Sequence, residues 1–334
     1  MTTTGGPLRI GTLGAARIAP LAIVKPGREV AGAELVAVAA RDPEKAAKFA
    51  RKHGIPRVHD TYDALLTDDD IDAVYNPLPN GLHGVWTMRA LEAGKHVLCE
   101  KPLTANADEA EQVAAAAAAT DLVVMEAFHY RYHPLEARMK EIVDSGELGR
   151  IRRLESWMCI PLPLFRDIRY NLDLAGGAVM DLGCYGIHQL RFLSGAEPTV
   201  IAARARLRSP QVDRWMRADF EWADGRTGRM TCALWSSTPL KVALRVTGDA
   251  GEMRVLNPAR PQSFHRLTVR TQDGKRGVRV KGDATYTYQL RAFVDAVHNG
   301  APVLTPLADS VANMRIVDAV YRKAGLEPRA PSTA

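Results

Sequence analysis

Lys101, at the end of an apolar segment, is a candidate catalytic residue because of its type and its position in the sequence. The stretch "HVLCEKP", from His96 to Pro102, puts Glu100 and Lys101 where a buried strand should end. A positioned ammonium can polarise a substrate oxygen and handle its proton, best where burial lowers its pKa toward neutrality. Glu100 could orient it, and Pro102 restricts the chain direction after it. The alternative is a lysine on a surface loop.

A second set of candidates lies in "DLGCYGIH", which contains Asp181, Tyr185 and His188. Their spacing of four and three residues places all three side chains on one face of a helix. Asp181 could instead cap the helix. Tyr185 could be a core aromatic residue, and His188 could satisfy a buried hydrogen bond. The residues alone leave these alternatives open.

The elements that must position these candidates change in character along the chain. Up to residue 127, apolar runs such as "LRIGTLG" and "ELVAVAA" alternate with helical stretches such as "PEKAAKFARKHG". That alternation is typical of a doubly wound parallel sheet with helices on both faces. After it, segments such as "RADFEWA" alternate polar and apolar residues, which is typical of an antiparallel sheet with one open face. We therefore expect an α/β chain with a Rossmann domain over residues 1–127. An α+β domain with a large, mostly antiparallel, open-faced sheet should occupy residues 128–334.

The turn after the first apolar run could hold a dinucleotide. Residues 14–19, "GAARIA", have the frame of G-x-G-x-x-G, with alanine at the second and third glycine positions. Ligands of open parallel sheets bind beyond the carboxyl ends of the strands, where a helix N-terminus can face phosphate. A tight packing turn would show the same pattern. The residues expected to contact the cofactor are Gly14, Ala16, Arg17 and Ile18.

The end of the second strand, "VAARD", bears on the choice of cofactor. Arg41 comes first, and a guanidinium can pair with a 2′-phosphate and stack on adenine. Asp42 could contact ribose hydroxyls, or it could simply cap the helix that begins with "PEKAAKF". The pattern favours NADP, with NAD possible.

Composition excludes several classes of protein. The net charge of +6 comes from scattered basic residues with acidic neighbours, without the arginine-rich tract of a nucleic-acid-binding protein. No segment predicts a secretory signal or a membrane span. The cysteines lie far apart with no C-x-x-C pair, which argues against a zinc site or a disulfide framework and suits a reducing, cytoplasmic location. We expect no metal. The cysteines are Cys99, Cys159, Cys184 and Cys232.

Five motifs taken together resemble the Gfo/Idh/MocA family of oxidoreductases. They are "ARDPEKA", "YNPLPNGLH", "EAGKHVLCEKPLT", "EAFHYRYHP" and "AGGAVMDLGCYGIHQLRFLSG", in order over roughly residues 8–195. The resemblance implies that Lys101 is the catalytic and substrate-binding lysine and that Tyr185 is the general acid/base, with Asp181 as its partner. It also implies a dimer or tetramer formed through the second sheet. With a tyrosine at this position, the chain is similar to the family members dimeric dihydrodiol dehydrogenase, glucose–fructose oxidoreductase and NADP-linked sugar dehydrogenases.

The resemblance also implies which other residues line the site. The further cofactor contacts that it implies are Leu78, Pro79, Asn80, His83, Glu100 and Lys101. The substrate contacts that we expect are Lys101, Arg169, Tyr185 and His188. Arg169 could bind a sugar hydroxyl or a phosphate, or it could lie in a solvated loop.

The expected activity is that of an NADP-dependent oxidoreductase acting on CH–OH groups. It should transfer a hydride between the nicotinamide and a sugar, polyol or related cyclic alcohol or ketone. Two alternatives remain: a trans-dihydrodiol dehydrogenase acting on aromatic diols, and a catalytically silent nucleotide or sugar sensor.

Overall fold

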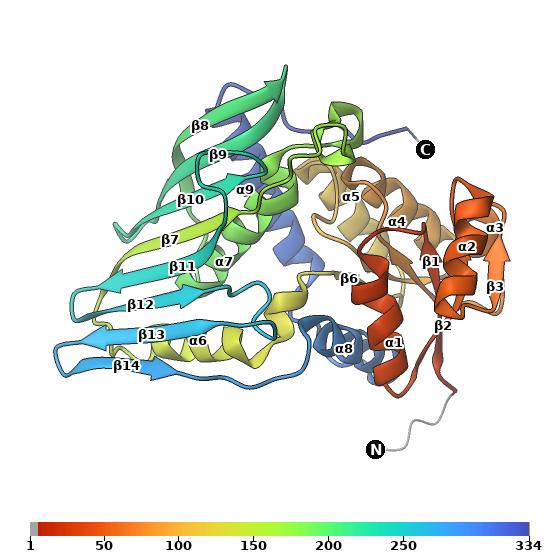
Figure 1. Cartoon of the computed structure of the whole chain (residues 1–334), viewed down its shortest axis with the longest axis horizontal. Coiled ribbons are helices and arrows are strands. Elements are labelled where there is room, and N and C mark those ends of the chain that lie inside the picture. The colour runs from red at the N-terminus through yellow and green to blue at the C-terminus, as the bar shows by residue number, and fades with distance from the viewer. Residues whose placement is uncertain (1–5, 334) are drawn as a thin grey trace. The chain divides into compact units, whose positions relative to one another are not determined.

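The computed structural model describes residues 6–333, which divide into two compact units. Within that range, unit 1 comprises residues 6–132, 286–311 and 331–333. Unit 2 comprises residues 133–285 and 312–330. Each unit is built around one sheet (Figure 1).

The described part of unit 1 contains a six-stranded parallel sheet in the order β3-β2-β1-β4-β5-β6. This is the doubly wound order, so the predicted Rossmann fold is confirmed. The direction of strand order reverses between β1 and β4, and the carboxyl end of β1 is therefore where such sheets bind ligands. The strands are β1 (Leu8–Leu13), β2 (Ala33–Ala39), β3 (Arg57–His59), β4 (Ala73–Asn76), β5 (His96–Cys99) and β6 (Val124–Glu126).

Helices bury both faces of this sheet because successive strand residues point to opposite sides. Leu13 belongs to one apolar cluster with Trp86 of α4, and Ile10 belongs to another with Phe293 of α8. The helical segments of unit 1 are η1 (Pro20–Val24), α1 (Lys25–Glu29), α2 (Pro43–His53), α3 (Tyr62–Leu66), η2 (Asn80–Leu82), α4 (His83–Glu92), α5 (Ala107–Ala118), η3 (His129–Tyr132) and, from residue 286 on, α8 (Thr285–Asn299).

The placement of α8 differs from the domain boundaries expected from the sequence. Those boundaries put everything after residue 127 in the second domain, whereas residues 286–311 belong to unit 1. The reason is burial: Leu290, Phe293 and Val294 of α8 join the apolar cluster that contains Ile10 and Ile23. Unit 1 is thus discontinuous in sequence.

Unit 2 is built on an eight-stranded sheet in the order β14-β13-β12-β11-β7-β10-β9-β8. Its described pairs are antiparallel except for β7 with β10, which confirms the predicted mostly antiparallel sheet. The strands are β7 (Ile151–Cys159), β8 (Thr199–Ser209), β9 (Val212–Glu221), β10 (Thr227–Ala233), β11 (Lys241–Gly248), β12 (Gly251–Leu256), β13 (Arg266–Thr271) and β14 (Gly274–Val278).

Helices cover one face of the second sheet. On β7, Leu154 and Met158 are buried on the side where α7 packs, while Glu155 and Trp157 alternate with them and are partly exposed. The helical segments of unit 2 are α6 (Pro134–Asp144), η4 (Ile168–Tyr170), η5 (Leu172–Leu174), η6 (Val179–Gly183), α7 (Cys184–Ser194) and, from residue 312 on, α9 (Leu307–Lys323). No helix among residues 6–333 has the length and apolar character needed to cross a membrane.

Candidate functional site

The turn after β1 has the backbone of a tight strand-to-helix connection. Gly14 has φ +103°, a conformation that L side chains rarely adopt, and its N–H donates to the carbonyl of Ala39 at 2.6 Å. The carbonyl of Ala16 accepts from the N–H of Ala19 at 3.1 Å, which bends the chain toward η1. Arg17 is exposed at this turn, and Ile18 is partly buried. The four predicted cofactor contacts therefore belong to one turn at the carboxyl end of β1.

Asp42 and Arg41 have different roles in the structure. The Asp42 carboxylate accepts from the N–H of Lys45 at 3.1 Å and caps α2, which was the alternative that the sequence left open. Arg41, directly before it, is exposed at the carboxyl end of β2. Asp42 is thus engaged with its own helix, and Arg41 stays the predicted contact for a 2′-phosphate.

Tyr62 is a residue of this region that sequence reasoning missed. Burial raises the pKa of its phenol, and a hydrogen bond to the backbone of Arg41 opposes the shift. A Cβ built on Gly14 would lie 3.9 Å from the Tyr62 hydroxyl. Its ring packs edge-on against Trp86, with 4.8 Å between centroids. Tyr62 therefore links the β1 turn to the end of β2. A tyrosine that opens a short helix after β3 offers no sequence signal for this role.

The loop after β4 is held by a buried histidine. His83 is 1% exposed, and its two ring nitrogens each lie 2.7 Å from a carbonyl oxygen, one of Leu78 and one of Pro102. Burial lowers the pKa of His83 to about 4, so at neutral pH the ring has one N–H and donates to one carbonyl at a time. His83 is thus a brace between the loops after β4 and β5. Pro79 and Asn80, between these contacts, are partly buried.

Lys101 lies in a loop whose neighbours are fixed. The N–H of Glu100 donates to the carbonyl of Asn76 at 2.9 Å, and its carboxylate accepts from the hydroxyl of Tyr75 at 2.8 Å. Pro102 is buried, with its carbonyl at His83. Glu126, which is 1% exposed, accepts from the N–H of Leu103 at 2.9 Å. Lys101 itself is only partly buried, so a rigid base presents its side chain at the carboxyl end of β5.

In unit 2, the structure brings two of the predicted site residues together. Nε of Arg169 lies 3.0 Å from a carboxylate oxygen of Asp181, and Nη1 lies 3.0 Å from Asp167. The charge of Asp181, followed by that of Asp167, holds the pKa of Arg169 above its ordinary value although burial opposes it. Asp181 therefore lies within η6 as the ion-pair partner of Arg169. It is not the N-cap of this helix, which was the alternative left open by the sequence, because the N-cap is Ala178.

Tyr185 and His188 lie on α7 and are buried, at 7% and 2% exposure. The preceding η6 is a π-helix, whose wider turn places Asp181 outside the regular α-helical spacing. The one-face argument therefore applies within α7, to Tyr185 and His188. Short π-helical segments occur often at functional sites.

Two glycines allow this helix to approach the sheet. A Cβ on Gly183 would meet the sulfur of Cys232 at 3.1 Å, and one on Gly186 would meet Met230 at 2.8 Å and Ser156 at 3.1 Å. The motif "GCYG" thus has a packing explanation: its glycines face the strands, and Tyr185 lies between them. No group of three or more potential metal-binding side chains occurs in the described range.

Comparisons with known proteins agree over most of the chain. Residues 8–128 match the oxidoreductase family with NAD-binding Rossmann fold, GFO_IDH_MocA, and residues 137–254 match the GFO/IDH/MocA C-terminal domain. D-xylose 1-dehydrogenase (NADP(+)) 2 of Haloferax volcanii is 39% identical over 323 residues, covering 95% of this chain and 97% of that protein. Trans-1,2-dihydrobenzene-1,2-diol dehydrogenase of Xenopus laevis is 30% identical over 213 residues, covering 63% of this chain and 64% of that protein.

A solved structure is similar over nearly the whole length. The 3-ketoreductase of Actinomadura kijaniata, in complex with NADP and TDP-benzene, has a TM-score of 0.89 and 30% identity, covering 98% of this chain and 100% of that chain. It has also been solved with a lysine replaced by alanine and with a tyrosine replaced by phenylalanine. On these matches and on the two folds described above, the chain belongs to the Gfo/Idh/MocA family of oxidoreductases.

Proposed function

We propose that the protein is an NADP-dependent oxidoreductase that transfers a hydride between the nicotinamide and a sugar, polyol or related cyclic alcohol or ketone. The observation that carries the proposal is the braced loop at the carboxyl end of β5, which holds Lys101 between the buried Glu100 and Pro102. The similarity to an NADP-dependent D-xylose 1-dehydrogenase over 95% of the chain supports a sugar as the substrate.

The residues of unit 1 fit a dinucleotide. Gly14, at φ +103°, allows a turn with no side chain at the switch point of the sheet. When bound, the nicotinamide accepts or returns the hydride. The proposed contacts follow the turn after β1, the loop after β4 and the loop after β5, with Arg41 at the 2′-phosphate. His83, whose ring lies between the carbonyls of Leu78 and Pro102, stays among the proposed cofactor contacts.

The proposed proton chemistry uses Lys101 and Tyr185. In the oxidative direction, Lys101 donates a hydrogen bond to the substrate hydroxyl, whose proton passes to the phenolic oxygen of Tyr185 as the carbinol C–H bond breaks. A neighbouring ammonium favours the ionised phenol, which is the form that accepts a proton. In the reductive direction, Tyr185 returns the proton to the former carbonyl oxygen. General acid/base transfer of this kind contributes about 10²–10⁴-fold.

Asp181, Arg169 and His188 complete the proposed site. Because Arg169 is paired with both Asp181 and Asp167, the pairs fix the direction of its guanidinium, and its remaining N–H groups are the proposed donors to a substrate hydroxyl. His188, next to Tyr185 on the same helix, is a proposed substrate contact.

The cofactor preference can be tested at Arg41. Arg41→Ala should raise the KM for NADP about 10- to 100-fold, the loss expected for one charge-assisted phosphate contact. The KM for NAD should change by less than about twofold, because NAD has no 2′-phosphate to lose a contact. Arg51→Ala, which removes an exposed arginine in the last turn of α2, is the matched control. Equal effects of Arg41→Ala on the two cofactors would remove the argument for NADP.

The proposed activity can be tested by a substrate screen. The absorbance of the purified protein would first be checked for the band of bound reduced nicotinamide. Aldoses, inositols and cyclic diols would then be supplied with NADP or NAD and the same band followed. Turnover of a sugar or polyol supports the proposal. Turnover confined to an aromatic trans-diol supports the second candidate, which the similarity to the Xenopus laevis diol dehydrogenase favours. Cofactor binding without any turnover supports a sensor.

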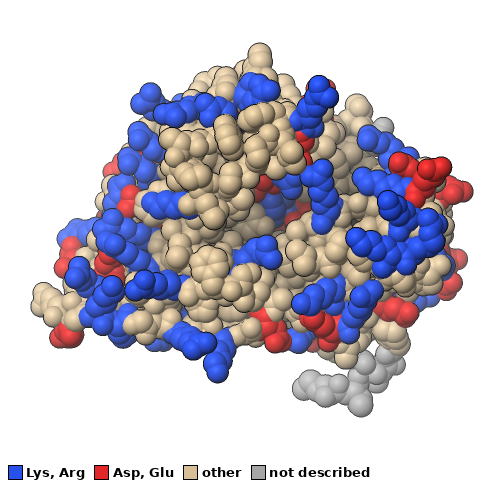
Figure 2. Space-filling model, in the orientation of Figure 1, with Lys and Arg blue, Asp and Glu red and all other residues tan. Residues whose placement is uncertain are grey.

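We further propose that the open face of the second sheet pairs with a second copy of the chain, giving a dimer or tetramer. Charges of alternating sign lie side by side across its strands: Arg229 pairs in register with Asp219 and Glu155, and Arg245 pairs with Glu155. Figure 2 shows Lys and Arg spread over this part of the surface with acidic groups between them. An alternating row can match itself across a two-fold axis, as a symmetric dimer requires.

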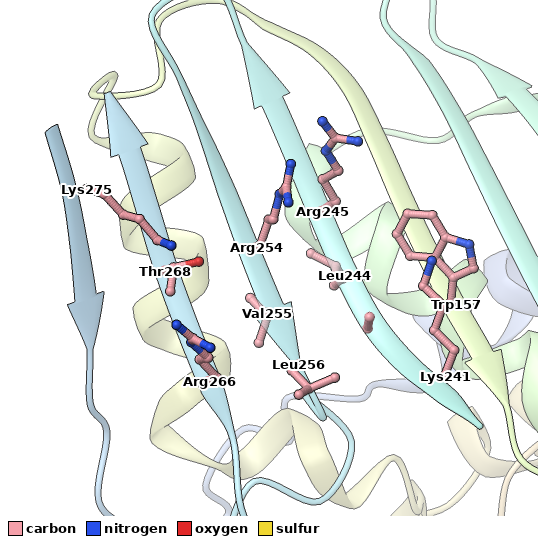
Figure 3. Close-up of a pocket in the computed structure, with 11 residues that line it drawn as sticks. Trp157, Lys241, Leu244, Arg245, Arg254, Val255, Leu256, Arg266, Thr268 and Lys275 are labelled. Atoms are coloured by element: carbon pink, nitrogen blue, oxygen red, sulfur yellow. The ribbon is translucent and has the colours of Figure 1, made fainter. Parts of the chain in front are cut away.

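A groove of about 470 Å³ lies on the same face. As Figure 3 shows, its lining residues come from β7, β11, β12, β13 and, through Lys275, β14. The Nζ of Lys241 lies 3.5 Å from the centre of the Trp157 ring. Arg245→Glu should break the charge alternation and lower the mass measured by light scattering to that of one chain. Arg138→Glu, on a partly exposed position of α6, is the control. A wild-type protein of single-chain mass would contradict the proposal.

We also propose a cytoplasmic location, supported by four widely spaced cysteines that are buried free thiols, and testable by cell fractionation.

A further inference from the structure

A buried ion pair in unit 2 ties the C-terminal segment to the sheet. Arg329 and Asp213 have side chains that are 1% and 0% exposed, with Nη2 of the arginine 3.0 Å from a carboxylate oxygen. Burying two charges costs free energy that their attraction only partly offsets. Such a pair is therefore weak evidence for stability, and the question is what its geometry specifies.

The guanidinium of Arg329 contacts three different parts of the chain. Its Nε donates to the carbonyl of Gly176 at 2.8 Å, and Nη2 donates to the carbonyl of Gln211 at 2.7 Å as well as to Asp213. The guanidinium also lies over the ring of Tyr321, 4.0 Å from its centre. The Tyr321 hydroxyl donates to the same Asp213 oxygen at 3.0 Å. Arg329, Asp213 and Tyr321 are called the buried cluster below.

The buried cluster contacts the segment that leads into η6 at two points, the carbonyl of Gly176 and the N–H of Val179. The second carboxylate oxygen of Asp213 accepts from the N–H of Val179 at 2.9 Å. A Cβ on Gly177 would lie 2.2 Å from Asp213, so this glycine is pressed directly against the cluster. Gly176, Gly177 and Val179 are consequently fixed where the chain enters the helix that carries Asp181 and Tyr185.

The same segment reaches the ion pair of the proposed site. The N–H of Gly177 donates to the carbonyl of Arg169 at 2.9 Å, and the N–H of Asp181 donates to the carbonyl of Gly177 at 3.1 Å. The side chain of Arg169 in turn pairs with Asp181. A continuous set of contacts therefore runs from Arg329 through the glycines to Asp181.

We propose that the buried cluster positions the start of the helix that carries Asp181 and Tyr185, and that Arg329 is a positioning residue for the reaction. The inference rests on the proposed function in one respect: Tyr185 is taken as the general acid/base and Asp181 as part of the same site. It assigns the C-terminal segment a part in catalysis through backbone geometry, without contact to the substrate.

Arg329→Lys is the informative change because it keeps the buried positive charge. A lysine presents a point charge and lacks the planar fork that reaches Gly176, Gln211 and Asp213 together. We expect kcat to fall about 10- to 100-fold, the effect of a misplacement of about 1 Å in a catalytic group. The KM for NADP should stay within about twofold, since the dinucleotide contacts are proposed in unit 1. Tyr321→Phe should shift kcat in the same direction by less, because it removes a single hydroxyl from the cluster.

Hydrogen–deuterium exchange separates positioning from a loss of overall stability. In Arg329→Lys, amides of residues 176–186 should exchange faster, while those of β12 and β13 should not change. Arg226→Lys is the matched control, because Nη1 of Arg226 donates to the carbonyl of Ser194 at the other end of the same helix. That variant should leave exchange at residues 176–186 and kcat unaltered.

The outcomes distinguish this inference from the proposed function. A wild-type protein without turnover refutes the proposed function, and the exchange experiment still tests whether the cluster holds residues 176–186. Normal kcat and normal exchange in both Arg329→Lys and Tyr321→Phe overturn the inference. The inference is also overturned if amides exchange faster throughout unit 2 and kcat falls only in proportion to the fraction of folded protein. If Arg329→Lys does not fold, Tyr321→Phe alone decides by the same two measurements.

Discussion

Lys101→Ala should lower kcat about 10²–10⁴-fold while the Kd for NADP stays within about twofold. The ammonium is proposed to polarise the substrate oxygen and to favour the ionised phenol, so its loss removes both effects from the transition state. The loop should persist, because Glu100, Pro102 and Leu103 are held by contacts that do not involve the Lys101 side chain. Steady-state kinetics and a fluorescence titration with NADP measure the two quantities.

Lys95, at the other end of the same strand, provides a matched control. It directly precedes β5 and is buried, and its ammonium donates to the carbonyls of Asp68 and Ile71 at 2.9 and 2.8 Å. Lys95→Ala should lower the Tm, because one buried and one partly buried carbonyl lose their donor, but leave kcat per folded molecule unchanged. Full activity in Lys101→Ala would contradict the proposed role. If Lys95→Ala lost as much kcat as Lys101→Ala, the loss would reflect disturbance of β5 in general and not the ammonium of Lys101.

Tyr185→Phe should also lower kcat about 10²–10⁴-fold, with little change in cofactor binding. The substitution removes one oxygen and keeps a ring of nearly the same shape in a buried position on α7. The Tm should therefore change little, and the pH dependence that the phenol contributes to kcat/KM should disappear. Undiminished turnover across the pH range in Tyr185→Phe would reject the tyrosine as the general acid/base.

The double variant tests whether the two groups act on one oxygen. Residues that work as a unit give strongly non-additive losses. Lys101→Ala combined with Tyr185→Phe should therefore lose much less than the product of the two single effects. If the double variant lost as much as the two single fold-losses multiplied together, the lysine and the tyrosine would act independently.

Local sequence patterns predicted the fold well because they reflect short-range physics. The alternation of apolar runs with helical periods is a property of neighbouring residues, and it predicted the parallel sheet of unit 1 and the mostly antiparallel sheet of unit 2. The G-A-A turn and the E-K-P segment were placed correctly at strand ends for the same reason, since each motif lies within a few residues of its strand.

Some local sequence patterns have two physical explanations, and only the tertiary structure distinguishes between them. Asp42 and Asp181 were each open to a helix-cap explanation from sequence. The structure shows Asp42 capping α2, and it shows Asp181 paired with Arg169 inside a π-helix. His83, predicted from sequence as a cofactor contact, has its two ring nitrogens 2.7 Å from the carbonyls of Pro102 and Leu78, and its contact with the cofactor stays a prediction. A carboxylate or an imidazole can serve several partners, and the sequence does not name the partner.

The sequence by itself determined which elements form, their order and the chemistry that the loops present. The tertiary structure decided which distant residues meet. Arg329 and Asp213 are 116 positions apart, and α8 completes a core begun by β1, yet neither association has a local signature. The physical reason is that periodicity and capping act over a few residues. Burial and polar pairing depend instead on how the whole chain folds back on itself, so a buried charge such as that of Arg329 has a partner that no nearby residue specifies.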